Sequence, residues 1–100
     1  MSNEVKDITP EVNAFKNICT QLFNLWEEKN RRYKGSFSEQ FKEFGLTSSI
    51  IRLSDKLNRL KFLAKDCTDC GDESIEDTLK DLANYAILTL MEISKSGEES

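Results

Sequence analysis

Residues that carry common enzyme chemistry or interrupt helices are scarce in this sequence. It has no histidine, one proline, four glycines and three cysteines in 100 residues. Without histidine, nucleophilic sites of the usual Ser/His and Cys/His kinds are excluded. Proline and glycine punctuate turns, so their scarcity favours a chain rich in helix. Cys67 and Cys70 have a spacing seen in zinc sites, but structural zinc needs four ligands and only Cys19 remains, so we expect no zinc site. Three cysteines is an odd count, and a chain without export signals normally keeps its thiols reduced, so we expect no disulfide.

Long apolar runs and an excess of positive charge are also missing. No stretch approaches the ~18 uninterrupted apolar residues of a membrane span, and the first residues lack the apolar core of a signal peptide. We therefore expect a cytoplasmic protein without a membrane partner. The net charge of −4 and the pI near 4.9 argue against binding to long nucleic acids, which requires many Lys and Arg residues against the phosphates. A small anion remains compatible with a local cationic cluster.

Apolar residues that recur at three- and four-residue steps predict an all-α protein, a compact bundle of about four helices. The helices are expected at about 9–33, 36–44, 47–65 and 74–93, and the second is short. Pro10 marks the first start, Gly35 and Gly45 mark ends, and Ser36 with Glu39 fits a capping box. One helical domain is expected over 9–93, with residues 1–8 and 94–100 disordered.

The buried faces follow from the same periodicity. The predicted inner residues are Val12, Phe15, Cys19, Leu22 and Trp26 in the first helix, Phe37, Phe41 and Phe44 in the second, Ile50, Leu53, Leu57, Leu60 and Ala64 in the third, and Ile75, Leu79, Leu82, Ala83, Ala86, Leu90 and Ile93 in the fourth. Leu88 and Met91 lie opposite the inner face of the fourth helix, so apolar groups surround its second half. Such a helix is central or lies at a subunit interface, and a short chain buries little of its own surface. We therefore expect a homo-oligomer.

A charged stripe follows the third predicted helix. Arg52, Asp55, Lys56 and Arg59 occupy positions i, i+3, i+4 and i+7, opposite the apolar face. The three cations are suited to phosphate oxygens, and Asp55 could orient a guanidinium. The alternative is a solvated face with Arg–Asp pairs that stabilise the helix by a few tenths of a kcal/mol each.

A second stripe follows the fourth predicted helix. Helical geometry aligns Asp77, Asp81 and Asn84, with Glu73 near the helix start on the same side. Carboxylates at i and i+4 repel one another, and a Mg²⁺ ion with oxygen ligands would relieve that repulsion. Glu73, Asp77 and Asp81 are the candidate ligands, and Asn84 is a candidate orienting residue. The alternative is compensation by cations of the third helix, Lys56 and Arg59 in particular.

The only basic cluster of this acidic chain lies at residues 29–34, where the first predicted helix gives way to a turn. Lys29 and Lys34 could hold phosphates, and Tyr33 could stack on a base. The alternative is a cationic helix end that complements the helix dipole.

Three motifs, in this order, carry a resemblance to a known family. They comprise Lys29, Tyr33, Gly35 and Ser36, then Arg52, Asp55, Lys56, Arg59 and Leu60, and finally Glu73, Ser74, Asp77, Thr78, Leu79, Asp81, Leu82, Ala83 and Tyr85. Over about residues 15–90 the chain resembles the nucleotide-modification-associated domain family of the first type, which is found largely in phages and mobile elements. Lys34 separates Tyr33 from Gly35, which are adjacent in the family pattern. If the chain is phage-encoded, the host cytosol is the expected location.

The last helix is also similar, more weakly, to the acidic helix of the all-α nucleoside-triphosphate pyrophosphohydrolase (MazG-like) superfamily, in which carboxylates on two helices hold Mg²⁺ against a triphosphate. A second acidic pair would come from Glu27 and Glu28 or from Glu39 and Glu43, and neither pair has the spacing of that superfamily. The similarity implies Mg²⁺ as a cofactor.

Three functional hypotheses follow. The first is a protein that acts on or holds a phosphorylated nucleotide between the third and fourth helices, with Mg²⁺-dependent pyrophosphohydrolase-like turnover left open. The second is a non-catalytic counter-defence sponge that sequesters a nucleotide signal, cyclic nucleotides included. The third is a helical adaptor that binds another protein. The residues proposed to contact the nucleotide are Arg52, Lys56, Arg59, Lys29, Tyr33, Lys34 and Tyr85. No group that would read the base is identifiable.

Overall fold

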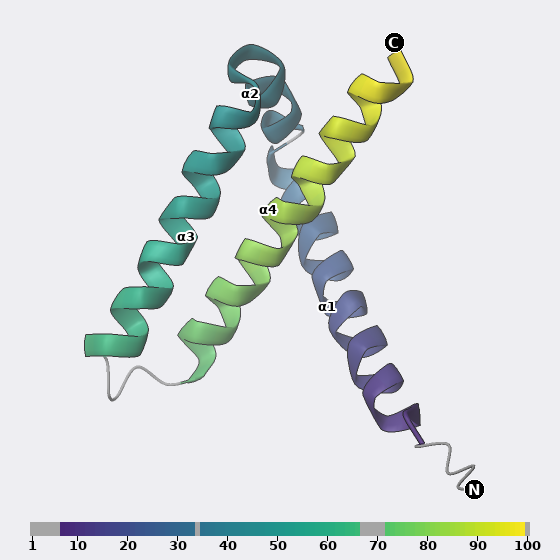
Figure 1. Cartoon of the computed structure of the whole chain (residues 1–100), viewed down its shortest axis with the longest axis vertical. Coiled ribbons are helices and arrows are strands. Elements are labelled where there is room, and N and C mark those ends of the chain that lie inside the picture. The colour runs from purple at the N-terminus through teal and green to yellow at the C-terminus, as the bar shows by residue number, and fades with distance from the viewer. Residues whose placement is uncertain (1–6, 34, 67–71, 100) are drawn as a thin grey trace, which may run out of the picture. The chain divides into compact units, whose positions relative to one another are not determined.

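The structure is a computed structural model that describes residues 7–33, 35–66 and 72–99, the side chains of 66, 72–74 and 96–99 excepted. Its helices are α1 (Thr9–Tyr33), α2 (Ser36–Phe44), α3 (Leu46–Asp66) and α4 (Asp72–Glu99), and the described residues include no strand (Figure 1). The predicted all-α class, with four helices of which one is short, is confirmed. The segment with Cys67 and Cys70, and the first six residues of the expected disordered N-terminus, lie outside the described residues.

The chain divides into two compact units, residues 1–32 and 33–100, and each is described by itself. The single domain over residues 9–93 therefore stays a prediction. α4 continues to Glu99, beyond the Ile93 end that the apolar pattern predicts. Along the described residues, no helix has both the length and the apolar character needed to cross a lipid bilayer.

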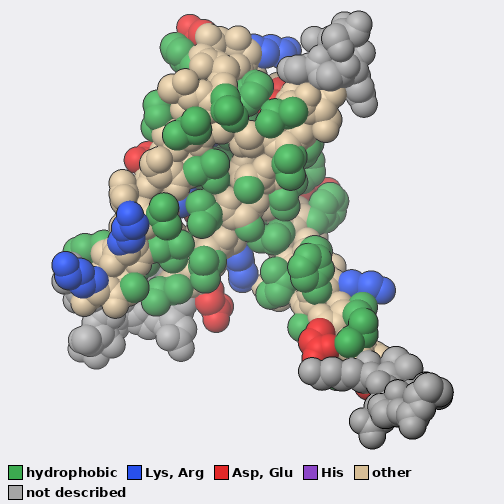
Figure 2. All heavy atoms as spheres, in the orientation of Figure 1, with side chains coloured by type: hydrophobic (Ala, Val, Ile, Leu, Met, Phe, Trp, Pro, Cys, Tyr) green, Lys and Arg blue, Asp and Glu red, His purple; other side chains and the backbone are tan. Residues whose placement is uncertain are grey.

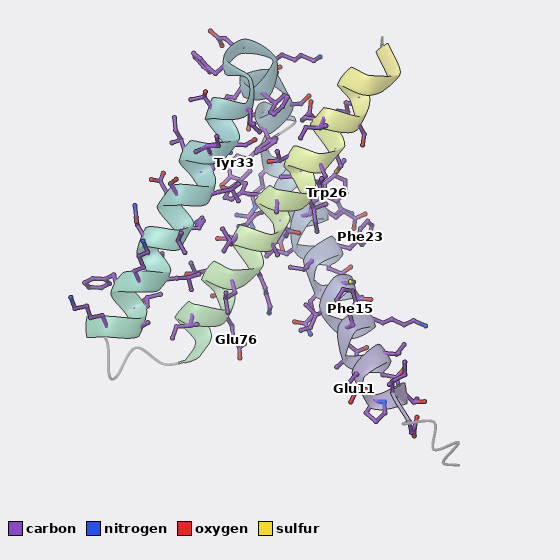
Figure 3. All side chains as sticks on the ribbon, viewed as in Figure 1. Glu11, Phe15, Phe23, Trp26, Tyr33 and Glu76 are labelled. Carbon is purple, nitrogen blue, oxygen red and sulfur yellow. The ribbon has the colours of Figure 1, made fainter. Side chains whose placement is uncertain are left out.

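The first unit consists essentially of α1. The Asp7 carboxylate accepts a hydrogen bond from the Thr9 amide at 2.9 Å, which satisfies one of the unpaired N–H groups at the helix start. Hydrogen bonds from the side chain and backbone of Thr9 lower the pKa of Asp7. Further along, the rings of Phe23 and Trp26 lie 5.9 Å apart and tilted (Figure 3). An exposed ion pair joins Glu28 to Arg32 near the end of the helix.

Two glycines set the boundaries of α2, as the sequence predicts. Gly35 and Gly45 adopt φ values of 78° and 69°, a region that disfavours residues with a Cβ atom. The Gly45 amide donates to the carbonyl of Phe41 at 2.7 Å and closes the helix. The predicted capping box of Ser36 and Glu39 is wrong, because Gly35 is the N-cap and no side chain caps the helix. The left-handed backbone of Gly35 already sets the turn.

In the second unit, α3 and α4 form an antiparallel hairpin, and α2 contacts both (Figure 1). The Ser38 hydroxyl of α2 donates to the Glu92 carboxylate of α4 at 3.1 Å, and Lys95 pairs with the other oxygen of Glu92 at 3.0 Å. Glu92 is buried, so this contact satisfies a charge that would otherwise be costly to place there. α2 is thereby held against the far end of α4.

The interior of this second unit is unusually polar. Of its described residues, the buried ones are Leu63 and the polar Ser48, Ser49, Thr78, Thr89 and Glu92. Two of the hydroxyls bond to backbone carbonyls of their own helix or its start: Thr89 to Tyr85 at 2.7 Å and Ser48 to Gly45 at 2.9 Å. Local bonds of this kind let small polar residues pack between helices. Small polar groups therefore occupy the interior of this unit, and among the described side chains the fully buried Ser49 hydroxyl has no hydrogen-bond partner.

Several residues predicted to face inward are instead exposed. They are Ile50, Leu57 and Ala64 on α3, Leu79, Ala86, Leu90 and Ile93 on α4, Phe44 on α2, and Val12, Phe15 and Cys19 on α1. The periodicity is present, but the buried positions include Leu63 on α3 and Thr78 and Thr89 on α4, and Lys56 pairs with Asp81 across the two helices. Figure 2 shows hydrophobic side chains spread over α3 and α4 on the face in view. The predicted inner faces thus form an exposed surface in the single chain.

Candidate functional site

An ion pair between α3 and α4 forms the centre of the candidate site. Lys56 Nζ lies 3.1 Å from Asp81 Oδ2, and the two side chains are 27% and 19% exposed. Partial burial reduces solvent screening, which strengthens a pair relative to one at the surface. The alternative of helix-three cations compensating the acidic stripe is thus realised between Lys56 and Asp81.

Arg52, one helical turn before Lys56, lies against two aromatic rings. Its guanidinium carbon is 5.2 Å from the Phe37 ring centroid and 5.6 Å from that of Tyr85. The two rings are stacked, with centroids 6.1 Å apart and planes at 19°. Arg52 Nη2 also donates to Gln40 Oε1 on α2. A cation over ring faces is attracted by their negative potential, so the rings hold the guanidinium in place.

Tyr85 connects the two cations, because Lys56 Nζ lies 6.0 Å from its ring centroid. We name Arg52, Lys56, Asp81, Tyr85 and Phe37 the charged seam. Phe37 comes from α2, both cations come from α3, and Asp81 and Tyr85 come from α4. All five side chains are partly buried. The seam carries two positive charges and one negative charge. Its net positive charge in an acidic chain makes it suited to a small anion.

The other members of the two predicted stripes lie around the seam. Arg59, one turn beyond Lys56, and Asp55 are exposed on α3. On α4, Asp77 is exposed and Asn84 is half-buried. Among the described side chains, Arg59 makes no ion pair, so it can turn toward a ligand bound near Lys56.

The predicted Mg²⁺ ligands are only partly described. The side chain of Glu73 lies outside the described residues, and no group of three metal-ligating side chains occurs among those described. Asp81 has the Lys56 ammonium beside its carboxylate, and a divalent cation on that oxygen would repel the ammonium. A metal ion on that oxygen of Asp81 would therefore require Lys56 to move away. The Mg²⁺ site of Glu73, Asp77 and Asp81 stays a prediction.

The residues of the predicted basic cluster are only partly described, and they fall where the two units meet along the sequence. Lys29 is half-buried on α1 in the first unit, and Tyr33 is exposed at the end of that helix. Lys34 lies outside the described residues. The assignment of Lys29, Tyr33 and Lys34 to a nucleotide stays a prediction.

Two residues of α2 contribute to the site and were not predicted from the sequence. Phe37 lies under Arg52, and Gln40 accepts its hydrogen bond. The pattern assigned Phe37 to the apolar side of a short helix together with Phe41 and Phe44. The spacing of Phe37 and Gln40 at i and i+3 places both on one side of α2, but only the packing of α2 beside α3 brings them to Arg52.

One comparison with known proteins gives a match, and it covers the candidate site. Searches of curated proteins and of solved structures give no match. The family model described as nucleotide modification associated domain 1 matches residues 29–93, which include α2, α3, most of α4 and the whole charged seam. The chain belongs to the nucleotide modification associated domain 1 family.

Proposed function

We propose that this chain binds a phosphorylated nucleotide at the charged seam. The observation that carries the proposal is the pair of half-buried cations, Arg52 and Lys56, one helical turn apart and beside the stacked rings of Phe37 and Tyr85. Cations next to aromatic rings offer the two kinds of contact that a nucleotide requires, one for phosphate and one for a base. Membership of a nucleotide-associated family supports the same reading.

The phosphate would bind by exchanging partners within the seam. Arg52 presents a planar fork that suits two phosphate oxygens, and Lys56 adds a point charge. In the free protein these groups are held by Gln40 and Asp81. A phosphate with more negative charge than one carboxylate competes well for Lys56, and exposed Arg59 would supply a third contact.

The base would stack on the aromatic part of the seam. Stacking of a base on an aromatic side chain contributes about 1–3 kcal/mol and tolerates any base, because every base has a π face. Tyr85 is the natural partner, since both cations lie next to its ring. The proposed ligand is therefore defined by its phosphates and its aromatic base, not by the identity of that base.

Binding and turnover make different demands on Asp81. In a holding protein, Asp81 orients Lys56 and is displaced by phosphate. In a Mg²⁺-dependent hydrolase, Asp81 would join Glu73 and Asp77 as a metal ligand, and the ion would polarise the phosphate and activate water. The ion pair at 3.1 Å favours the first role, so we propose binding without a metal requirement.

Isothermal titration of the full chain with nucleoside mono-, di- and triphosphates and cyclic nucleotides, with and without Mg²⁺, tests this proposal. Lys56→Ala should weaken binding at least ~10-fold, the effect of one charge-assisted hydrogen bond. Lys65→Ala, at an exposed lysine in the last turn of the same helix, should bind like the wild type. Nucleotide recovered intact after denaturation would support holding, whereas Mg²⁺-dependent release of pyrophosphate would show turnover.

Asp81→Asn gives the sharpest result, because the two roles predict opposite signs. If Asp81 competes with phosphate for Lys56, the variant should bind several-fold more tightly without metal. If Asp81 is a metal ligand, the variant should lose Mg²⁺-dependent binding and cleavage. Absence of binding by every nucleotide, or a folded Lys56→Ala protein that binds like the wild type, would overturn the proposal.

A further inference from the structure

An apolar groove runs along the α3–α4 hairpin on a different side from the charged seam. It encloses about 600 Å³. Its lining residues are Ile50, Leu53, Ser54 and Leu57 of α3 and Leu79, Leu82, Ala83 and Ala86 of α4. At about 100° per residue, the α3 lining lies roughly 100–200° around the helix from Arg52. Ser54 is the only polar residue among the lining, so water in the groove has few partners.

The apolar surface continues beyond the groove. Six large side chains on this face are each about half exposed: Leu46, Ile50 and Leu57 on α3, and Leu79, Leu90 and Ile93 on α4, with values from 46% to 64%. Burial of apolar surface is favourable in proportion to its area, so this face favours packing against another apolar surface.

The charges at one end of the groove are complementary to themselves. Lys61 continues the groove row of α3, four residues after Leu57, and Glu76 continues the row of α4, three residues before Leu79. Because α3 and α4 are antiparallel, both charges lie at the same end, where Figure 3 places Glu76 near the start of α4. Both residues are exposed. A second copy, related by a twofold axis along the helices, would bring opposite charges together at both edges.

We propose that this face binds a second copy of the chain, so that two α3–α4 hairpins form a four-helix bundle with the axis along the helices. The groove residues of one copy pack on those of the other, and Lys61 lies opposite Glu76 of the partner subunit. Burial of both grooves drives the association, and the charge pairs fix its register. The charged seams stay outside the interface, one on each copy.

Sedimentation velocity of the full chain over a dilution series tests the proposal. The wild type should be a dimer that dissociates on dilution. Leu79→Glu places a carboxylate in the apolar interface and should weaken association at least ~100-fold. Ile51→Glu is the matched control. Ile51 is exposed to a similar extent as Leu79 but lies on α3 away from the groove, so this variant should remain dimeric. Circular dichroism of both variants establishes that they are folded.

A charge exchange tests the register and does not disturb the apolar core. Lys61→Glu and Glu76→Lys should each weaken the dimer, because each homodimer then opposes like charges. A mixture of the two variants should form a heterodimer of near wild-type stability, since both of its edges carry opposite charges. A wild type that is monomeric at every concentration would overturn the proposal and leave α1 of the same chain to cover the groove. Equal dissociation by Ile51→Glu, or a mixture without heterodimer, would also overturn it.

Discussion

The charged seam and the apolar groove are two sides of the same α3–α4 hairpin, and they reverse the usual relation between burial and polarity. Lys56 and Asp81 lie where the helices meet, whereas Leu57 and Leu79 are about half exposed. Soluble chains usually bury leucine and expose lysine. A hairpin that does the opposite places polar groups at its internal contact and leaves apolar residues exposed, and these are the residues that the proposed dimer would bury. The contacts that define the seam all lie within the second unit.

This difference predicts where the second unit derives its stability. Leu63 is 4% exposed and is its one buried hydrophobic residue among those described. Leu63→Ala should lower the free energy of unfolding by about 2–5 kcal/mol, because a cavity forms where neighbouring atoms cannot follow. Urea denaturation measures the loss. Leu57→Ala, in the half-exposed groove, should cost under about 1.5 kcal/mol in dilute protein, and an equal loss at both positions would contradict the comparison.

The sequence predicted the helices better than it predicted their contacts. Gly35 and Gly45 end helices because glycine adopts positive φ values readily. This is a property of a single residue, so a short segment of sequence is enough to recognise it. Lys56 shows the limit: periodicity placed it opposite the apolar face and left its pairing with the acidic stripe as one of two alternatives, whereas the structure pairs it with Asp81 between α3 and α4. Periodicity identifies an apolar stripe but not which neighbour it meets. A stripe reserved for a second chain and one packed within the chain have the same pattern.

The ion pair of the seam can be tested apart from its role in binding. Lys56→Met removes the ammonium and leaves the partly buried Asp81 carboxylate without that charge, so the free energy of unfolding should fall by about 1–2 kcal/mol. Adding Asp81→Leu should recover most of that loss, because two apolar side chains pack in place of the pair. A double-mutant cycle by urea denaturation gives the coupling. If no coupling is found, the pair does not stabilise the hairpin.

Gly45 lies between α2 and α3, the helices that supply Phe37, Arg52 and Lys56 of the charged seam. A Cβ atom added there meets no atom within 4 Å, so the cost of Gly45→Ala comes from the φ of 69° alone. The expected loss of stability is at least about 1 kcal/mol, because φ of 69° with ψ of −155° is a backbone conformation that glycine alone adopts readily. Because α2 carries Phe37 and Gln40, we also expect weaker nucleotide binding with unchanged self-association. Titration and sedimentation of the same variant separate the two effects, and a loss of association alone would reverse the assignment of the faces.

The smallest effect is expected at an ion pair outside both faces. Arg32 Nη2 and Glu28 Oε1 lie 2.8 Å apart on α1, closer than the Lys56–Asp81 pair, but the side chains are 62% and 64% exposed. Water and salt screen such a pair, so Glu28→Gln should change stability by less than about 0.5 kcal/mol, and the change should vanish at high salt. Thermal unfolding at low and high salt measures it. A loss of stability as large as that from Lys56→Met would mean that partial burial does not make the Lys56–Asp81 pair stronger than an exposed pair. The distance between the charges would then set the strength of both pairs.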